Sequence, residues 1–147
     1  MSFFGLKNKT VISKKRKAPA KKLAWHKDAG IQSEMEKIVK GIGFDHIREG
    51  RVFCYRTTGS RARAYARIWA FPKIFQQVLD IQPAYVMEII SEKFDRLPSN
   101  EKTKVIIHEL LHIPKNFSGS LLPHSYGHTK IEREVNVLYE KYKTVNR

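Results

Sequence analysis

The segment VIIHELLHIP, residues 105–114, constrains the fold more than any other part of the sequence. It has uncharged flanks and no internal proline, which predicts a largely buried helix that ends at the second histidine, because the closing proline disfavours helical geometry in the residue before it. A buried polar side chain without a hydrogen bond costs roughly 1–3 kcal/mol. The fold must therefore place hydrogen-bond partners or a metal ion beside the side chains of His108, Glu109 and His112.

The spacing of these two histidines suits a shared metal ion. On an α-helix, residues four apart differ by about 40° around the axis and about 6 Å along it, so both imidazoles can reach one ion. Glu109 is turned by about 100° from His108, which makes it a poor ligand but a suitable general base for a metal-activated water. The pattern predicts Zn²⁺ bound by His108 and His112. The alternative is a buried helix whose three polar side chains are only hydrogen-bonded.

A third protein ligand is needed, since a catalytic zinc typically has three protein ligands and one open position. Three residues after the helix are candidates: His124, His128 and Glu132. Cys54 is the only cysteine, which excludes a thiolate zinc cluster and an intramolecular disulfide. The residues alone leave the choice among the three candidates open.

The remaining patterns predict an α+β fold with a small sheet. Ser33 to Glu36 has the form of a capping box, and Tyr65, Arg67 and Trp69 alternate with small residues whose side of the strand suits packing against a helix. The predicted elements are a helix over 28–42, two paired strands over 51–58 and 64–71, a helical turn over 73–79, a strand over 83–90, a helix from about Ser99 as N-cap to His112, and an amphipathic helix over 129–143.

The positive charge is concentrated at the N-terminus. The net charge is +14, and residues 1–27 contain nine Lys or Arg and no acidic residue, which leaves 19 basic and 14 acidic residues in the remainder. The first part has few core-forming residues, so we predict a flexible basic tail over residues 1–24 and a folded domain over 25–147. The tail either keeps the protein in solution or contacts the phosphates of a nucleic acid or another acidic surface.

The composition gives no sign of a membrane protein. The 41% hydrophobic content is enough for one core, and no apolar run reaches the roughly 18 residues that span a bilayer. The N-terminus lacks the apolar core of a secretory signal. We expect a soluble, cytoplasmic protein.

Three segments, ARIWAFPKIFQQ, AYVMEIISEKFDRLP and HELLHIPKNFSGSLLPH, resemble the metallopeptidase family found in phages and archaea, a minimal relative of the zincin proteases. The resemblance covers roughly residues 30–142. It implies a compact zincin-like domain, with a small sheet, the HExxH helix and a C-terminal helix, that hydrolyses peptide bonds with zinc.

In this family HELxHI is followed by a Gly-containing loop and a histidine preceded by Pro or Arg. The resemblance therefore implies that His108, His112 and His124 bind the metal and that Glu109 is catalytic. His128 has no clear counterpart in the family, and Glu132 matches the spacing of glutamate-liganded zincins.

The resemblance to zincins also implies that an edge strand beside the metal helix binds extended peptide through main-chain hydrogen bonds. ARIWAF and AYVMEII are the candidates, and Trp69 and Tyr85 either contact substrate or belong to the core. Residues Tyr126, Arg133 and Tyr139 are candidate oxyanion stabilisers.

We interpret the chain as a zinc metallopeptidase. Two other hypotheses remain: a nucleic-acid-binding protein in which zinc is only structural, and a protease recruited to nucleic-acid-bound proteins by its basic tail. Peptide hydrolysis that depends on Glu109 distinguishes the peptidase from the structural zinc protein.

Overall fold

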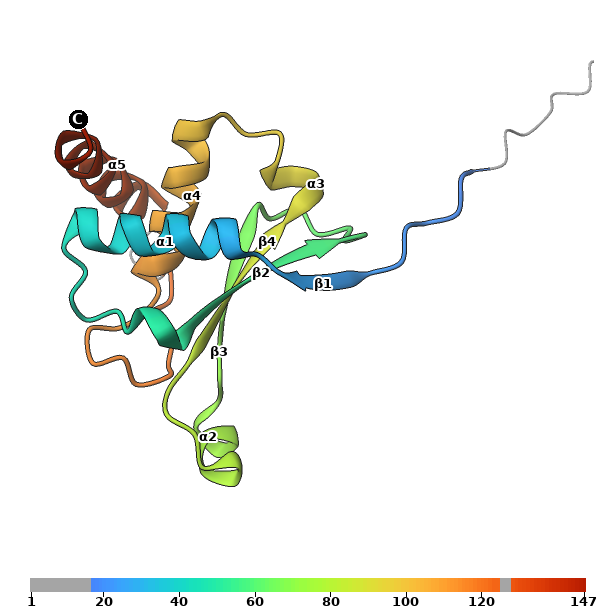
Figure 1. The fold of residues 1–147 in the computed structure, drawn as a ribbon, viewed down its shortest axis with the longest axis horizontal. Helices are drawn as coiled ribbons and strands as arrows, with labels where there is room; N and C mark the ends of the chain where they lie inside the picture. The colour runs from blue at the N-terminus through green and yellow to red at the C-terminus, as the bar shows by residue number, and fades with distance from the viewer. Residues whose placement is uncertain (1–16, 125–127) are drawn as a thin grey trace, which may run out of the picture.

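The computed structural model describes residues 17–124 and 128–147, except for the side chains of residues 128 and 129. Within these residues the fold is α+β, as predicted, with a four-stranded sheet and five helices (Figure 1). The elements are β1 (Ala24–Lys27), α1 (Ala29–Ile42), a 3₁₀ turn (Glu49–Arg51), β2 (Val52–Thr58), β3 (Ala66–Ala70), α2 (Lys73–Leu79), β4 (Tyr85–Ile90), α3 (Ser91–Phe94), α4 (Ser99–Leu111) and α5 (His128–Val145).

The strands are ordered β1-β2-β4-β3, with β2 and β4 parallel and both outer strands antiparallel to their neighbours. The predicted direct pairing of β2 with β3 is therefore wrong, because β4 lies between them. β4 is the most apolar strand and is buried along nearly its whole length, which only a central position allows. The segment between β2 and β3 also lacks the two-residue turn of a tight hairpin. β1, which is short and mostly exposed, was not predicted.

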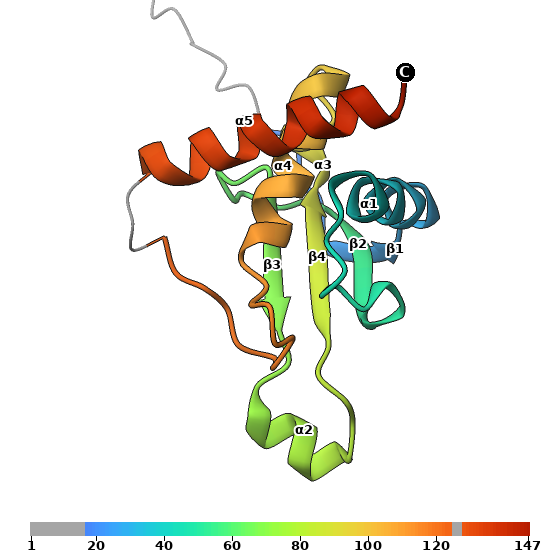
Figure 2. The same ribbon diagram turned by 90° about the vertical axis from the view of Figure 1, so that its left-hand side faces the viewer.

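Helices α1, α4 and α5 lie on one face of the sheet (Figure 1). α4 packs against β3 and α1 packs against β2, while α5 crosses both helices (Figure 2). The small side of β3 faces α4 as predicted, with Ala66 and Ile68 buried. The predicted stripe of α5 also packs on this core, through Ile131, Val135, Leu138 and Tyr142.

The start of α1 differs from the predicted capping box. Asp28 is the N-cap, and its Oδ1 accepts a hydrogen bond from the Ile31 N–H at 2.9 Å, whereas Ser33 lies inside the helix. The other carboxylate oxygen of Asp28 is 2.7 Å from Nε of Arg56 on β2. Asp28 therefore satisfies an unpaired helix amide and joins α1 to the sheet.

The ends of α4 also differ slightly from the prediction. Pro98 occupies the N-cap position, Ser99 is the first helical residue, and no side chain caps the helix. The helix ends at Leu111 with His112 as its C-cap. The second histidine thus lies at the point where the chain leaves the helix, close to the predicted end.

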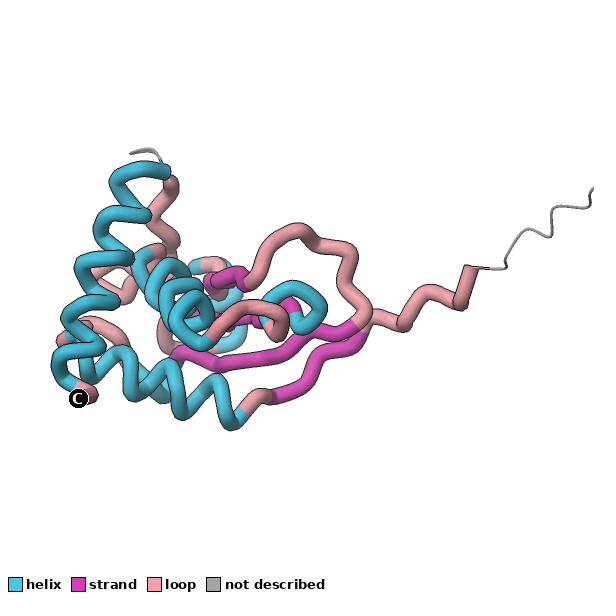
Figure 3. The backbone as a smooth tube through the Cα atoms, turned by 90° about the horizontal axis from the view of Figure 1, so that it is seen from above, coloured by secondary structure: helices cyan, strands magenta, loops and turns pink. Residues whose placement is uncertain are grey.

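The chain enters the sheet at the end remote from α5 (Figure 3). Residues 17–22 are exposed and belong to no helix or strand, while residues 1–16 lie outside the described part, so the division into tail and domain stays a prediction. In the described residues, no helix is long and apolar enough to cross a membrane.

We predict that Asp28→Ala lowers the free energy of unfolding by about 1 kcal/mol or more, because it removes the cap of α1 and one partner of Arg56. Asp28→Asn keeps an acceptor for the Ile31 amide and should cost less. Asp45, which is exposed, provides the control variant Asp45→Ala with little effect. Denaturant unfolding measures all three; equal stability of Asp28→Ala and wild type would contradict the assigned cap.

The same variants give a pH dependence. Burial alone would raise the pKa of Asp28, but the Ile31 amide and the Arg56 guanidinium outweigh it and hold the pKa below its usual value of 3.8. The ionised carboxylate therefore stabilises the fold at neutral pH, and this contribution is lost as the pH falls below about 4. The stability difference between wild type and Asp28→Asn should shrink over that range.

Candidate metal centre

Three histidines meet at one end of α4. Nε2 of His108 is 3.1 Å from Nε2 of His124 and 3.4 Å from Nε2 of His112. Each ring offers one nitrogen, and these three nitrogens all lie within 4.8 Å of one another. The helix supplies His108 and His112 and the following loop supplies His124, so the structure brings together the three residues that the family resemblance implied as ligands.

The tautomer of His112 is set by the backbone of the loop. Its Nδ1 lies 2.7 Å from the carbonyl oxygen of Leu122, and because a carbonyl only accepts, Nδ1 carries the proton. Nε2 is then left with its lone pair directed at the other histidines. A ligating histidine typically has such a partner on its second nitrogen. The Leu122 amide also donates to the His112 carbonyl at 2.7 Å, which fastens the loop to the end of the helix.

The spacing fits a divalent metal ion. Imidazole nitrogens bound at roughly 2.0–2.1 Å in a tetrahedral arrangement are about 3.3 Å apart. This is close to the 3.1 Å between His108 and His124 and the 3.4 Å between His108 and His112. Neutral imidazoles without thiolates suit zinc and other transition metals. His108, His112 and His124 are thus able to hold one ion.

A buried tyrosine supports the loop that carries His124. The Tyr85 hydroxyl accepts a hydrogen bond from the Gly119 amide at 2.8 Å and donates one to the Ser120 carbonyl at 2.9 Å. Its ring packs edge-on against Phe117, with the centroids 4.9 Å apart. Gly119 has a φ of +87°, which side-chain-bearing residues rarely adopt. Tyr85 therefore belongs to the core and fixes the path of the loop.

Glu109 lies on the same helix but points toward the sheet. It is only 9% exposed. Burial raises the pKa of Glu109 to about 7, although the backbone N–H of Ile68, which donates to its carboxylate, partly opposes this shift. A carboxyl group whose pKa lies near neutrality can both accept and donate a proton at physiological pH.

The donor to Glu109 comes from the open edge of the sheet. The Tyr65 carbonyl accepts from the Ile90 amide of β4, and the Phe71 amide donates to the carbonyl of Ala84, just before β4. Because backbone groups alternate along a strand, Ala66, Ile68 and Ala70 direct theirs away from β4. β3 is therefore an edge strand beside the histidine cluster. β4, the other candidate edge strand, is central, so that alternative is wrong.

The other candidate ligands have different positions. Glu132 is exposed and lines a surface hollow together with His108, but it is not part of the three-nitrogen group found among the described residues. His128 begins α5, and its side chain lies outside the described part, as does Tyr126. Arg133 is exposed, and the ring of Tyr139 lies about 5 Å from the ammonium groups of two lysines, Lys104 and Lys143.

Sequence reasoning did not identify Tyr85 and Leu122 as supports of the site. No sequence pattern indicated that the Tyr85 hydroxyl contacts the loop. The role of Leu122 belongs to its backbone, which any residue type provides. Only the fold shows these two contacts.

Three imidazoles around one point, with a buried carboxylate on the same helix, define a candidate metal centre. The family model described as "Putative phage metallopeptidase" matches residues 23–144, so the chain belongs to this metallopeptidase family, as the resemblance implied. Comparison with curated proteins and with solved structures gave no match.

We predict that Tyr85→Phe weakens metal binding by roughly tenfold, because it leaves the Gly119 amide and the Ser120 carbonyl unpaired and loosens the loop that holds His124. Competition with a chromophoric chelator measures the affinity, at a temperature where circular dichroism shows the variant folded. Tyr55→Phe is the matched control, since the Tyr55 hydroxyl has no hydrogen bond to the described residues. Equal affinity of Tyr85→Phe and wild type would contradict the supporting role.

Proposed function

We propose that this protein is a zinc-dependent metallopeptidase that hydrolyses peptide bonds with Glu109 as general base. The observation that carries the proposal is the convergence of three histidines beside a buried glutamate that contacts an edge strand. Membership of a metallopeptidase family agrees with it.

In this proposal His108, His112 and His124 hold the zinc ion. When bound, zinc polarises a carbonyl oxygen and lowers the pKa of water towards 7. The Glu109 carboxylate takes a proton from the attacking water and passes it to the nitrogen of the departing amine. The peptide bond is thereby broken into a carboxylic acid and an amine. Ile68 keeps this carboxylate oriented, because its amide donates to it.

The substrate is proposed to bind along β3. The backbone groups of Ala66 and Ala70 face away from β4 and can pair with an extended peptide, as in strand addition to a sheet edge. A peptide added there lies next to the residue whose amide contacts Glu109. Tyr85 is buried in the core and Trp69 lies on the opposite face of the sheet, so neither is assigned to this edge.

We propose nucleic acid as the partner of the basic tail, as a second and separate function. Residues 17–22 are exposed and include Lys17, Lys21 and Lys22. A tail of this kind contacts phosphates without base readout, so affinity should fall steeply with salt. This would bring the peptidase to proteins on nucleic acid.

We predict that purified protein binds one zinc ion per chain and that His108→Ala, His112→Ala and His124→Ala each lose it. His26→Ala, which removes an exposed histidine of β1, should retain it. Elemental analysis of protein prepared without added metal gives the stoichiometry. If His124→Ala keeps the metal while His128→Ala or Glu132→Ala loses it, the proposed third ligand is wrong.

We predict that Glu109→Gln retains zinc but loses peptide hydrolysis by about 100-fold or more, because the amide cannot accept the proton of water. Release of dye from labelled casein measures cleavage. Glu101→Gln is the control on the same helix, where Glu101 forms an ion pair with Lys104 at 3.6 Å. Unchanged cleavage by Glu109→Gln would exclude Glu109 as the base, and zinc without any Glu109-dependent cleavage would favour a structural metal.

A further inference from the structure

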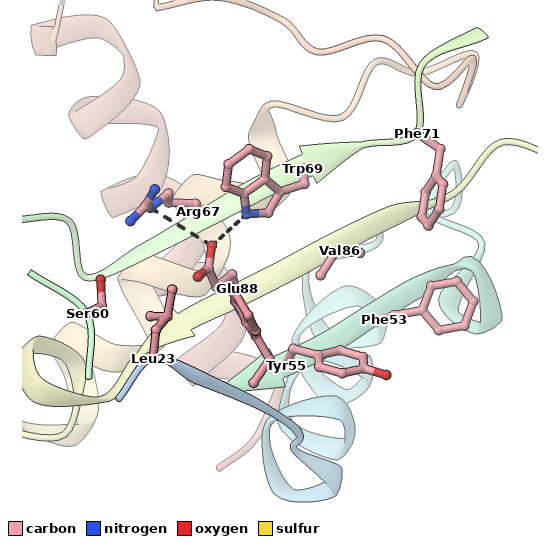
Figure 4. Close-up of a pocket in the computed structure, with 10 residues that line it drawn as sticks. Leu23, Phe53, Tyr55, Ser60, Arg67, Trp69, Phe71, Val86 and Glu88 are labelled. Atoms are coloured by element: carbon pink, nitrogen blue, oxygen red, sulfur yellow. Dashed lines mark hydrogen bonds and ion pairs between the residues drawn. The ribbon is translucent and has the colours of Figure 1, made fainter. Parts of the chain in front are cut away.

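The face of the sheet opposite the helices carries a groove lined by aromatic side chains (Figure 4). Its volume is about 690 Å³. The chain's only two tryptophans, Trp25 and Trp69, both line it and are 59% and 50% exposed. The remaining lining residues are Leu23, Phe53, Tyr55, Ser60, Arg67, Phe71, Val86 and Glu88. Large exposed aromatic surfaces of this kind mark interaction sites.

The floor of the groove holds one carboxylate that is already paired. Glu88 is 6% exposed and accepts hydrogen bonds from the Thr57 hydroxyl and the Trp69 indole, each at 2.6 Å. Nε of Arg67 is 4.0 Å from Glu88 and has no hydrogen-bond partner among the described residues (Figure 4). This Nε atom is buried, but the Arg67 side chain as a whole is partly exposed, so the terminal N–H groups of its guanidinium can donate to a ligand in the groove.

One end of the groove is bordered by cationic residues. The backbone of Lys22 approaches Gly59 so closely that a side chain at Gly59 would clash with it, which places residues 21–23 beside the loop after β2. That loop contains Arg61 and Arg63, which are exposed and form no ion pair with any described residue. Lys22 has no ion pair there either. The aromatic floor therefore has a positively charged rim.

We propose that this groove binds single-stranded nucleic acid, with bases stacked on the aromatic side chains and phosphates beside the rim. Every base has a flat face that can stack on an aromatic ring, and the phosphates complement the cations. The bases of a duplex are stacked inside it and cannot reach the rings. Glu88 does not repel this ligand from the groove, because it is buried and paired and the phosphates lie at the rim.

Charge complementarity favours this occupant over a protein segment. An apolar helix would cover the aromatic rings but leave Lys22, Arg61 and Arg63 without partners. An acidic peptide would pair with the cations but has few flat faces to stack on the rings. Single-stranded nucleic acid uses both features, and the proposal depends neither on the metal nor on peptidase activity.

Tryptophan fluorescence of the full chain tests the proposal directly, because both tryptophans line the groove. An oligothymidylate of roughly 15 nucleotides should quench the emission in a saturable manner, and salt should reverse the quenching. Inorganic polyphosphate carries charge without bases and should change the emission little, even if it binds the basic tail. A duplex of the same length should quench less.

Three results would overturn the proposal. The first is absence of quenching by the single strand, and the second is equal quenching by polyphosphate, which would assign the contact to charge alone. The third is stronger quenching by polyglutamate than by the oligonucleotide, which would assign the groove to an acidic protein segment.

Variants locate the contact independently of the reporter. In anisotropy titrations of a labelled oligothymidylate, Trp25→Ala should weaken binding roughly tenfold, and Trp25→Phe should restore most of it. Phe75→Ala removes an aromatic side chain that is 54% exposed on α2, outside the groove, and should leave affinity unchanged. Equal affinity of Trp25→Ala and wild type would refute stacking on Trp25.

Replacing both arginines of the loop, Arg61→Ala with Arg63→Ala, should weaken binding and reduce its salt dependence. The matched control is Lys37→Ala, which removes an exposed cation from α1 on the other side of the sheet. If the salt dependence of binding were unchanged in the double variant, the proposed contact between the phosphates and the rim would be wrong.

Discussion

The packing of α4 on the small side of β3 is the contact on which the candidate site depends. Ala66 and Ile68 keep this side of the strand shallow, so the helix approaches closely enough for the Ile68 amide to reach Glu109. The same approach removes the Glu109 carboxyl from water, which raises its pKa. A bulkier strand would separate the helix from the edge of the sheet and return this carboxyl to solvent. One packing contact thus sets both the position and the acidity of the group.

The third histidine depends on a different set of contacts, because a loop cannot hold a side chain by helical geometry. The loop is fastened at Leu122 by two backbone hydrogen bonds of 2.7 Å with His112, one to its ring and one to its carbonyl. The Tyr85 hydroxyl fastens it again at Gly119 and Ser120. Leu122 and Tyr85, which offer no metal ligands, therefore hold the loop so that His124 lies beside the other two histidines. A metal ion bound there would stabilise the same arrangement.

Local patterns predicted the helices better than the sheet, for a physical reason. The apolar spacing in α4 and α5 and the i, i+4 histidines are properties of neighbouring residues, so they were visible in the sequence. The pairing of β2 with β4 joins residues about thirty positions apart, such as Cys54 and Met87, and no local signal encodes it. The predicted capping box at Ser33 was wrong, because the Asp28 side chain caps α1 by accepting a hydrogen bond from the Ile31 amide, and only the fold reveals this bond. The family resemblance, and not the spacing of the residues, indicated that His124 would lie beside His108 and His112.

The alternation of a single strand separates the two proposed surfaces. Ile68 directs its side chain toward the helices and its amide toward Glu109, whereas Trp69 directs its side chain into the groove on the other face. Peptide at the edge would use backbone groups of β3, and nucleic acid on the face would use its side chains, so the two ligands do not compete for the same atoms. A nucleic-acid strand bound in the groove would then leave the edge of β3 open. A protein carried on that nucleic acid would lie within reach of the histidine cluster. The short edge strand β3 is therefore the element through which recruitment and cleavage would be joined.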